Sequence, residues 1–345
     1  MPLRGYRRYR PWLIPGMIIL SSVLLAGCVT ENQPSVLNPK GPVAQQVSTL
    51  SWILFGAAAI VVVVVTILLF AAYSRRRDDV SQPLIIQPGD RRVLTLVLVG
   101  GAVIPAIVLI ILMGMSISIE NRAAARASSA SGPVIEVIAH QWWWEVHYPE
   151  PGFTTANEIH IPVGQPVTLE LSSVDVIHSF WVPQLHPKLD VIPGHTNTMT
   201  LQADTAGTYR GECAEYCGVQ HAHMQFLIIA QPQQEYDQWV AMQQQPAIEP
   251  EAGTVEQEGQ QVFLESACAN CHTIQGTNAA GELGPDLTHF ASRETIGAGT
   301  RPNTRSDLAG WIMNSQAVKP GNLMPPMELT SDQLEALLDF LQTLQ

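Results

Sequence analysis

The sequence predicts a multidomain chain, in which a two-span transmembrane helical hairpin is followed by an all-β sandwich and an all-α domain. Two long apolar runs, a middle region of short β-rich segments and a C-terminal helical pattern predict these three parts. The 345 residues leave room for two or three domains, and 46% hydrophobic against 14% charged residues indicates membrane segments. The formal net charge of -12 argues against nucleic acid as a partner and favours a basic protein.

Residues 1–27 are predicted to be a signal peptide of the lipoprotein type. Four arginines precede the apolar run of residues 12–26, and this order is typical of a secretory signal. The run ends in Leu-Ala-Gly-Cys, which resembles the bacterial lipoprotein signal and implies lipid attachment to Cys28. A plain signal peptide or a first membrane helix is the alternative, although the run is short for a span. Residues 28–48, rich in Pro, Gln and Asn, are expected to form an exposed linker.

Residues 49–122 are expected to form the transmembrane hairpin. Residues 50–73 and 93–119 are each long and apolar enough to cross a bilayer as a helix, and Pro105 should kink the second one. Arginines at positions 75–77, 91 and 92 lie between the two runs. The positive-inside rule puts this loop in the cytoplasm and the rest of the chain outside. Buried core helices are the alternative for both runs.

Residues 132–231 are expected to form an antiparallel sandwich or barrel, because β-rich segments alternate there with turn residues. The expected strands are residues 134–139, 158–163, 167–172, 178–182, 196–203, 208–212 and 225–230. Residues 232–253, with many Gln, Pro and Glu residues, are expected to be a second linker that contains a short helix at 236–242.

A soft-metal site is predicted in the loop before the last expected strand. Cys213, Cys217, His221 and Met224 fall within this loop, and thiolate, imidazole and thioether together select copper over magnesium, calcium or manganese. Zinc is the competing ion. A further imidazole is expected from elsewhere in the fold. His178 is the candidate, although a lone histidine on an apolar strand is by itself more often a core residue.

Residues 254–345 are expected to form a small helical domain with a covalent haem. The sequence Cys-Ala-Asn-Cys-His fits the c-type haem attachment pattern, in which the thiols of Cys268 and Cys271 form thioethers and His272 binds the iron. The sixth ligand is predicted to be the thioether of Met324, with Met327 as the alternative. A redox or zinc Cys-x-x-Cys pair is the competing interpretation. A covalently attached cofactor would stabilise a domain of this small size.

The metal loop, the upstream His-Ser-Phe at positions 178–180 and the two spans resemble subunit II of haem-copper cytochrome c oxidase. The later Cys-x-x-Cys-His resembles the caa-type variant with a fused cytochrome c domain. The resemblance implies that the sandwich is a cupredoxin and the last domain a class I cytochrome c. It also implies a dinuclear CuA centre with bridging Cys213 and Cys217, terminal His178 and His221, and weak ligands from Met224 and the Glu215 carbonyl.

The same resemblance implies a function for two further side chains. The Glu215 carboxylate would bind magnesium or manganese at the contact with subunit I. Trp142, in the run of tryptophans at positions 142–144, would be the point where electrons enter CuA. From the residues alone, the large apolar area of three indoles favours a core position for this run.

The resemblance implies a redox subunit of a terminal oxidase, anchored by two spans in the bacterial inner membrane, with both cofactor domains on the outer, periplasmic face. Electrons would pass from a donor, such as a c-type cytochrome or a quinol:cytochrome c oxidoreductase, through haem c to CuA. Subunit I, which reduces oxygen to water, would receive them. Other oxidase subunits and membrane lipid are expected partners. A membrane-tethered electron carrier and the CuA subunit of a nitric oxide reductase are the alternatives.

Overall fold

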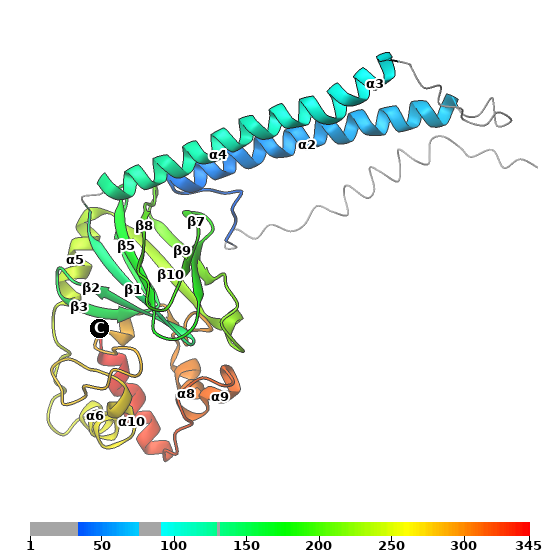
Figure 1. Cartoon of the computed structure of the whole chain (residues 1–345). Coiled ribbons are helices and arrows are strands. Elements are labelled where there is room, and N and C mark those ends of the chain that lie inside the picture. Colours follow the sequence, from blue (N-terminus) through cyan, green and yellow to red (C-terminus); the bar gives the residue numbers. More distant parts are fainter. Residues whose placement is uncertain (1–33, 76–90, 130–131) are drawn as a thin grey trace, which may run out of the picture. The chain divides into compact units, whose positions relative to one another are not determined.

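The computed structural model describes residues 34–75, 91–129 and 132–345 (Figure 1). Residues 34–345 cluster as one unit. The predicted signal peptide, Cys28 and the arginines at positions 76 and 77 lie outside the described residues. The lipid attachment and the cytoplasmic position of the arginine loop therefore stay predictions.

Two long apolar helical segments match the predicted spans. The first is α2 (Pro42–Arg75), and the second consists of α3 (Arg91–Leu98), the π-helical turn η2 (Val99–Val103) and α4 (Ile104–Ser129). Both are long and apolar enough to cross a membrane, and their most apolar stretches are not buried by other described residues. Pro105 has no N–H for the regular helical bond, and the backbone widens just before it, where the Ile104 N–H bonds to the Val99 carbonyl.

The expectation of an exposed linker up to residue 48 was wrong for its last part. Helix α2 already begins at Pro42, and Gly41, Val43 and Ala44 are buried. A Cβ at Gly41 would lie 2.4 Å from the Gln202 carbonyl oxygen, so the chain passes close to the sandwich there. Proline suits the first turn of a helix because its fixed φ is already helical and its missing N–H would be unpaired anyway.

In the described part of the chain, the sandwich consists of two five-stranded sheets (Figure 1). The first has the order β3 (Phe153–Ala156), β2 (Trp143–Tyr148), β1 (Val134–His140), β5 (Val167–Ser173) and β8 (Asn197–Leu201). The second has the order β4 (Glu158–Pro162), β10 (Gln225–Gln231), β9 (Gly207–Cys213), β6 (His178–Val182) and β7 (His186–Val191). Neighbours are antiparallel except for the parallel pairs β1–β5 and β4–β10. All expected strands are present, and β2, β3 and β7 are additional.

Aromatic side chains between the sheets fix the strands that carry the metal loop. Trp144 of β2, Phe180 of β6 and Phe226 of β10 are fully buried and in mutual contact, and the two phenyl rings stack with 4.3 Å between centroids. Gly211 of β9 makes room for Phe226, because a Cβ there would lie 2.2 Å from the ring. Strands β9 and β10 are thus held rigidly on both sides of the loop between them.

Helix α5 (Gln233–Gln243) continues the sandwich, so the second linker begins later than predicted. Tyr236 and Trp239 on this helix are buried in the sandwich core. The Trp239 indole also stacks on the imidazole of His160, with 3.9 Å between ring centroids. The expectation of a linker from residue 232 was wrong because the Gln-rich composition conceals two aromatic side chains that pack inward.

The last domain is helical, as predicted. Its elements are α6 (Val255–Glu265), α7 (Cys268–Cys271), η4 (Phe290–Ser292), the short strands β11 (Thr295–Ile296) and β12 (Arg301–Pro302), α8 (Arg305–Met313), α9 (Ser315–Val318) and α10 (Ser331–Thr343). Helix α10 begins with a capping box formed by Thr330 and Gln333. Helices α6 and α10 cross so closely that a Cβ at Gly259 would lie 1.9 Å from the Ala336 carbonyl oxygen. Helix α6 is followed directly by the short helix α7, which carries Cys268 and Cys271.

Candidate metal centre and haem site

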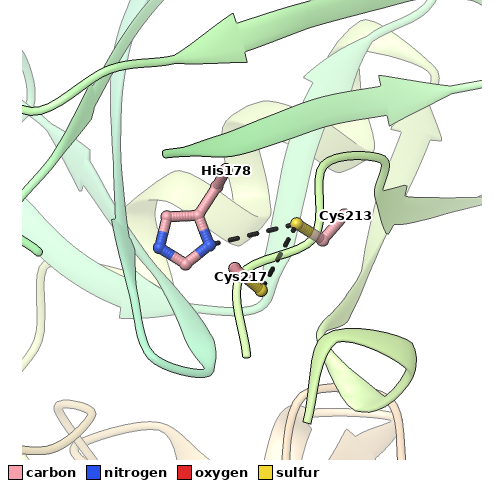
Figure 2. Close-up of side chains that lie close together, drawn as sticks. All are labelled: His178, Cys213 and Cys217. Atoms are coloured by element: carbon pink, nitrogen blue, oxygen red, sulfur yellow. Dashed lines mark hydrogen bonds between the residues drawn. The ribbon is translucent and has the colours of Figure 1, made fainter. Parts of the chain in front are cut away.

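Two thiols and an imidazole from three segments meet inside the sandwich (Figure 2). Cys213 ends β9, Cys217 lies in the loop after it, and His178 begins β6. The Sγ atoms are 3.8 Å apart, and His178 Nδ1 lies 3.9 Å from Cys213 Sγ. All three side chains are buried, so water does not compete for their donor atoms. The fold therefore brings His178 next to the two thiols although it is distant in sequence.

The other predicted ligands surround the same two sulfurs. His221 Nδ1 lies 3.8 Å and Met224 Sδ 3.9 Å from Cys217 Sγ, and the Glu215 carbonyl oxygen lies 3.3 Å from Cys213 Sγ. Each sulfur thus has one imidazole of its own. A single tetrahedral zinc ion takes four ligands, whereas two thiols, two imidazoles, a thioether and a carbonyl offer six donors that could hold two ions. The soft donor set favours copper for both.

Asp175 holds the His178 ring and was not identified from the sequence. Its Oδ1 lies 2.8 Å from His178 Nε2, which leaves Nδ1 directed at the Cys213 sulfur. Its Oδ2 accepts a hydrogen bond from the backbone N–H of Gln141 at 2.6 Å. Burial disfavours a charged imidazole, but hydrogen bonds to Cys213 and Asp175 outweigh it and raise the pKa of His178. A carboxylate behind a ligating histidine fixes the ring orientation and increases its basicity. Its place three residues before His178 is the only sequence signal.

The thiols of Cys213 and Cys217 form a hydrogen-bonded pair. The hydrogen bond between the sulfurs lowers the pKa of Cys213, and the neighbouring Cys213 sulfur raises the pKa of Cys217. The lowered pKa favours the thiolate form of Cys213, and the thiolate rather than the thiol is the metal ligand. A positively charged ion between the sulfurs would displace the second proton.

The tryptophans at positions 142–144 divide between the two expected roles. Trp144 is fully buried in the core, whereas Trp142 and Trp143 are half-buried. The Trp142 Nε1 donates a hydrogen bond to the Cys217 carbonyl at 3.0 Å, and the Gln141 amide nitrogen donates to the same oxygen at 2.7 Å. A Cβ at Gly218 would lie 3.0 Å from the Trp142 ring. One indole therefore packs directly on the backbone of the metal loop.

The c-type attachment motif faces a cavity in the helical domain. Cys268 and Cys271 are free thiols on the short helix α7, and both line this cavity. His272 Nδ1 lies 2.7 Å from the Pro285 carbonyl oxygen, so Nε2 remains available to bind a metal. Gly284 packs on the imidazole, where a Cβ would lie 2.6 Å from Cε1. Burial lowers the pKa of His272, which keeps the ring in the neutral form that binds iron.

The cavity has the lining that a haem requires, and part of it comes from the sandwich. The sandwich contributes four lining residues, which are Gln141, Trp142, Trp143 and Asn157. The lining residues of the helical domain include Phe263, Cys268, Cys271, His272, Arg293, Trp311, Lys319, Met324, Met327 and Leu341. Thiols for the attachment, an imidazole for the iron and apolar walls for the macrocycle are all present. The Arg293 Nε is buried without a partner among the described residues. A guanidinium in that position suits an acidic group of the ligand.

Both candidate thioethers, Met324 and Met327, line the cavity. The Met324 backbone is held more firmly: its carbonyl accepts hydrogen bonds from Ser315 Oγ at 2.5 Å and Gln316 Nε2 at 3.1 Å, and its amide donates to Asn322 Oδ1 at 2.8 Å. A ligand on a fixed backbone needs little rearrangement to reach the iron. These contacts favour Met324.

Replacing Met324 by leucine is expected to lower the haem midpoint potential and remove the absorption band of the sulfur–iron bond, because a thioether axial ligand raises the potential. Met327→Leu is the matched control and should retain both properties. Absorption spectra and redox titration of the purified protein measure them. The opposite result would assign the iron ligand to Met327.

Glu158 of β4 links the sandwich to the loop that carries Arg293. The residue is only 3% exposed, and its Oε1 accepts hydrogen bonds from the Glu294 and Thr295 amides at 2.8 and 3.0 Å. The Arg293 Nη2 in turn donates to Thr155 Oγ1 of the sandwich at 3.4 Å. Burial raises the pKa of Glu158 from 4.5 to about 7, although Arg293 and the two amides oppose this change.

Because the folded pKa of Glu158 lies above the unfolded one, its protonation stabilises the fold. This stabilisation is complete below pH ~4.5, is lost as the pH rises towards about 7, and amounts to roughly 3 kcal/mol. Glu158→Gln keeps the accepting oxygen and removes the titration, so the melting temperature should depend less on pH between 5 and 8. Thr155→Val removes the acceptor of the neighbouring Arg293 hydrogen bond without removing an acid and should keep the wild-type slope. Equal slopes for wild type and Glu158→Gln would contradict this assignment.

Comparison with known proteins identifies both domains. The family model of the cytochrome c oxidase subunit II periplasmic domain matches residues 152–231, and the cytochrome c family model matches residues 256–345. Cytochrome c oxidase subunit 2 of Alkalihalophilus pseudofirmus is 37% identical, over 94% of this chain and 94% of the relative. Quinol oxidase subunit 2 of Bacillus anthracis is 31% identical, over 68% of this chain and 81% of the relative.

Among solved structures, the periplasmic domain of subunit II of cytochrome oxidase (CoxB) of Bradyrhizobium japonicum matches with a TM-score of 0.32 and 29% identity, over 32% of this chain and 92% of that chain. The match to the relative from Alkalihalophilus pseudofirmus covers nearly the whole length of both proteins. The two family models account for the sandwich and the helical domain in turn. The chain therefore belongs to the cytochrome c oxidase subunit 2 family, in the form that carries a cytochrome c domain after its copper domain.

Proposed function

We propose that this subunit passes electrons from a covalent haem c to a dinuclear CuA centre and on to the haem-copper subunit I, which reduces oxygen to water. The ligands proposed for CuA are Cys213, Cys217, His178, His221, Met224 and the Glu215 carbonyl. The residues proposed for the haem are Cys268, Cys271, His272 and Met324. When bound, the two cofactors supply the one-electron chemistry of the subunit.

Trp142 is the single feature that carries this proposal. Its indole lines the haem cavity, and its Nε1 donates a hydrogen bond to the carbonyl of Cys217 at 3.0 Å. One side chain therefore contacts both the wall of the haem site and the backbone of a bridging thiolate. The presence of all copper ligands also distinguishes this function from that of a purely structural subunit.

The protein's own groups keep both sites rigid and dry. Asp175 fixes the His178 ring, and Pro285 fixes the His272 ring through its carbonyl oxygen. The donor atoms of Cys213, Cys217 and Met224 are buried among the aromatic side chains of the sandwich core. Little reorganisation is then possible when the charge of a site changes, which favours rapid electron transfer.

Metal analysis and rapid kinetics of the purified oxidase test the proposal together. We expect covalent haem c and a copper pair per chain, with the near-infrared band and the EPR spectrum of a mixed-valence centre. After photoreduction of haem c, the copper signal should follow without an added carrier. A single copper or zinc ion would exclude CuA, and haem reduction with no copper reduction would exclude the electron route.

An exposed carboxylate on the metal loop and the acidic charge of the chain support proposals for a second metal ion and for the electron donor. The Glu215 side chain is 45% exposed, and its Oε2 lies 3.9 Å from Lys188 Nζ. An exposed carboxylate suits a hard cation, so we propose magnesium or manganese at the contact with subunit I. The external donor is proposed to be a c-type cytochrome or a quinol:cytochrome c oxidoreductase, steered by the acidic charge of the chain.

The two apolar helices and the periplasmic family model indicate a membrane-anchored subunit with its copper domain on the outer face. We propose the bacterial inner membrane, where a lipid on Cys28 would add a second kind of anchor. A tethered cytochrome replaces diffusional encounter with a high effective concentration at the copper domain.

A further inference from the structure

Lys319 joins the cytochrome domain to the copper domain. It follows α9 and precedes the methionine loop, and it is only 3% exposed. Its Nζ donates hydrogen bonds to the carbonyl oxygens of Gly297, in the cytochrome domain, and Trp142, in the copper domain, at 2.9 and 2.6 Å. No carboxylate in the described chain forms an ion pair with this ammonium.

A buried ammonium without a carboxylate is costly, because it loses its hydration and gains only dipoles in return. Burial accordingly lowers the pKa of Lys319 to about 7. A methionine or leucine at this position could fill the same space without that cost. The bridge between the two carbonyl oxygens makes specific use of the amino group.

The residues after Lys319 contact the metal loop as well. The Gln220 Nε2 donates a hydrogen bond to the Pro320 carbonyl, and a Cβ at Gly321 would lie 3.2 Å from the Val219 side chain. The segment 319–321 therefore packs on residues 219–220, directly beyond the bridging Cys217. Lys319 is the member of this contact that also reaches Trp142.

We infer that Lys319 is a positioning residue for electron transfer between the two domains. Its ammonium joins the Gly297 carbonyl of the cytochrome domain to the Trp142 carbonyl of the copper domain and so fixes their relative orientation. This inference rests on the proposed electron route. Trp142 is fixed at two points, since its indole binds the Cys217 carbonyl and its own carbonyl binds Lys319. Without the second bond, the cytochrome domain keeps its covalent linker but loses one fixed orientation towards the copper domain. Transfer over a distance requires that orientation, as other reactions require aligned groups.

Lys319→Met in the complete purified oxidase tests the inference, because methionine keeps most of the apolar stem and removes the donors. The rate of copper reduction after photoreduction of haem c should fall about tenfold, as expected for a loss of alignment. Haem and CuA spectra and midpoint potentials should stay as in the wild type. Hydrogen exchange of the backbone around Trp142 should become faster. Lys40→Met is the control and should change neither the rate nor the exchange.

A second variant keeps the test decisive if Lys319→Met does not incorporate haem. The Lys319→Gln side chain is too short to bridge both carbonyl oxygens, so it should also slow the transfer. Wild-type rates together with wild-type hydrogen exchange in either variant would overturn the role of Lys319 and leave the proposed electron route intact. Failure of the wild-type haem to reduce copper would instead overturn the route, and with it the role of Lys319.

Discussion

Replacing Cys217 by serine is expected to eliminate the CuA centre while haem c stays attached. Cys217 is the sulfur around which the site gathers, with Cys213 Sγ at 3.8 Å, His221 Nδ1 at 3.8 Å and Met224 Sδ at 3.9 Å. A hydroxyl is a hard donor that does not ionise near neutral pH, so it cannot bridge two soft ions. The copper content should fall to a small fraction of the wild-type value, and the mixed-valence EPR spectrum should disappear.

Two histidines of the same loop provide the matched comparison. His221→Ala removes the imidazole next to Cys217 and should also lose the mixed-valence spectrum. His223→Ala should keep it, since the His223 Nδ1 faces Gln220 Oε1 at 2.7 Å rather than a sulfur atom. Haem content, measured in each variant, shows that the cytochrome domain is intact. An unchanged EPR spectrum in Cys217→Ser would disprove the bridging role.

The site ligands could be predicted from sequence because soft donors are rare and occur here in a short loop. Cys213, Cys217, His221 and Met224 lie near one another because a single loop between two paired strands carries them. His178 needed the resemblance to a known family, since nothing local distinguishes it from a core histidine. Asp175 was missed because its carboxylate reaches the His178 ring only through the folded turn before β6.

The contacts between domains could not be predicted from sequence at all. Lys319 and Trp142 are far apart along the chain, and no periodicity links a buried lysine to a distant carbonyl. Glu158 stands at the start of an expected strand, and nothing in the sequence indicates that it is buried. In the structure, the loop of the cytochrome domain that carries Glu294 packs over it. Strand β2 was missed because Trp143 and Trp144, which lie at the cavity and in the core, are both apolar, so its first residues show no alternation of polar and apolar residues.

Trp142 should have the largest effect of any single residue that binds neither cofactor. In Trp142→Leu, we expect the transfer from haem c to CuA to slow roughly a hundredfold, because the side chain that joins the cavity to the Cys217 carbonyl is lost. Leucine occupies part of the space but offers neither a π system nor an N–H. Copper and haem contents should be unchanged, because Trp142 supplies no metal ligand.

Trp143→Leu separates the electron route from the loss of aromatic packing. Trp143 lines the same cavity and stacks on His140 with 4.3 Å between ring centroids, but its indole forms no hydrogen bond to Cys217 in the described structure. If the Trp142 indole is the route, this variant should keep most of the wild-type rate measured after photoreduction of haem c. Equal losses in the two variants would mean that the cavity wall as a whole matters, and the Trp142 indole would then have no special part in the transfer.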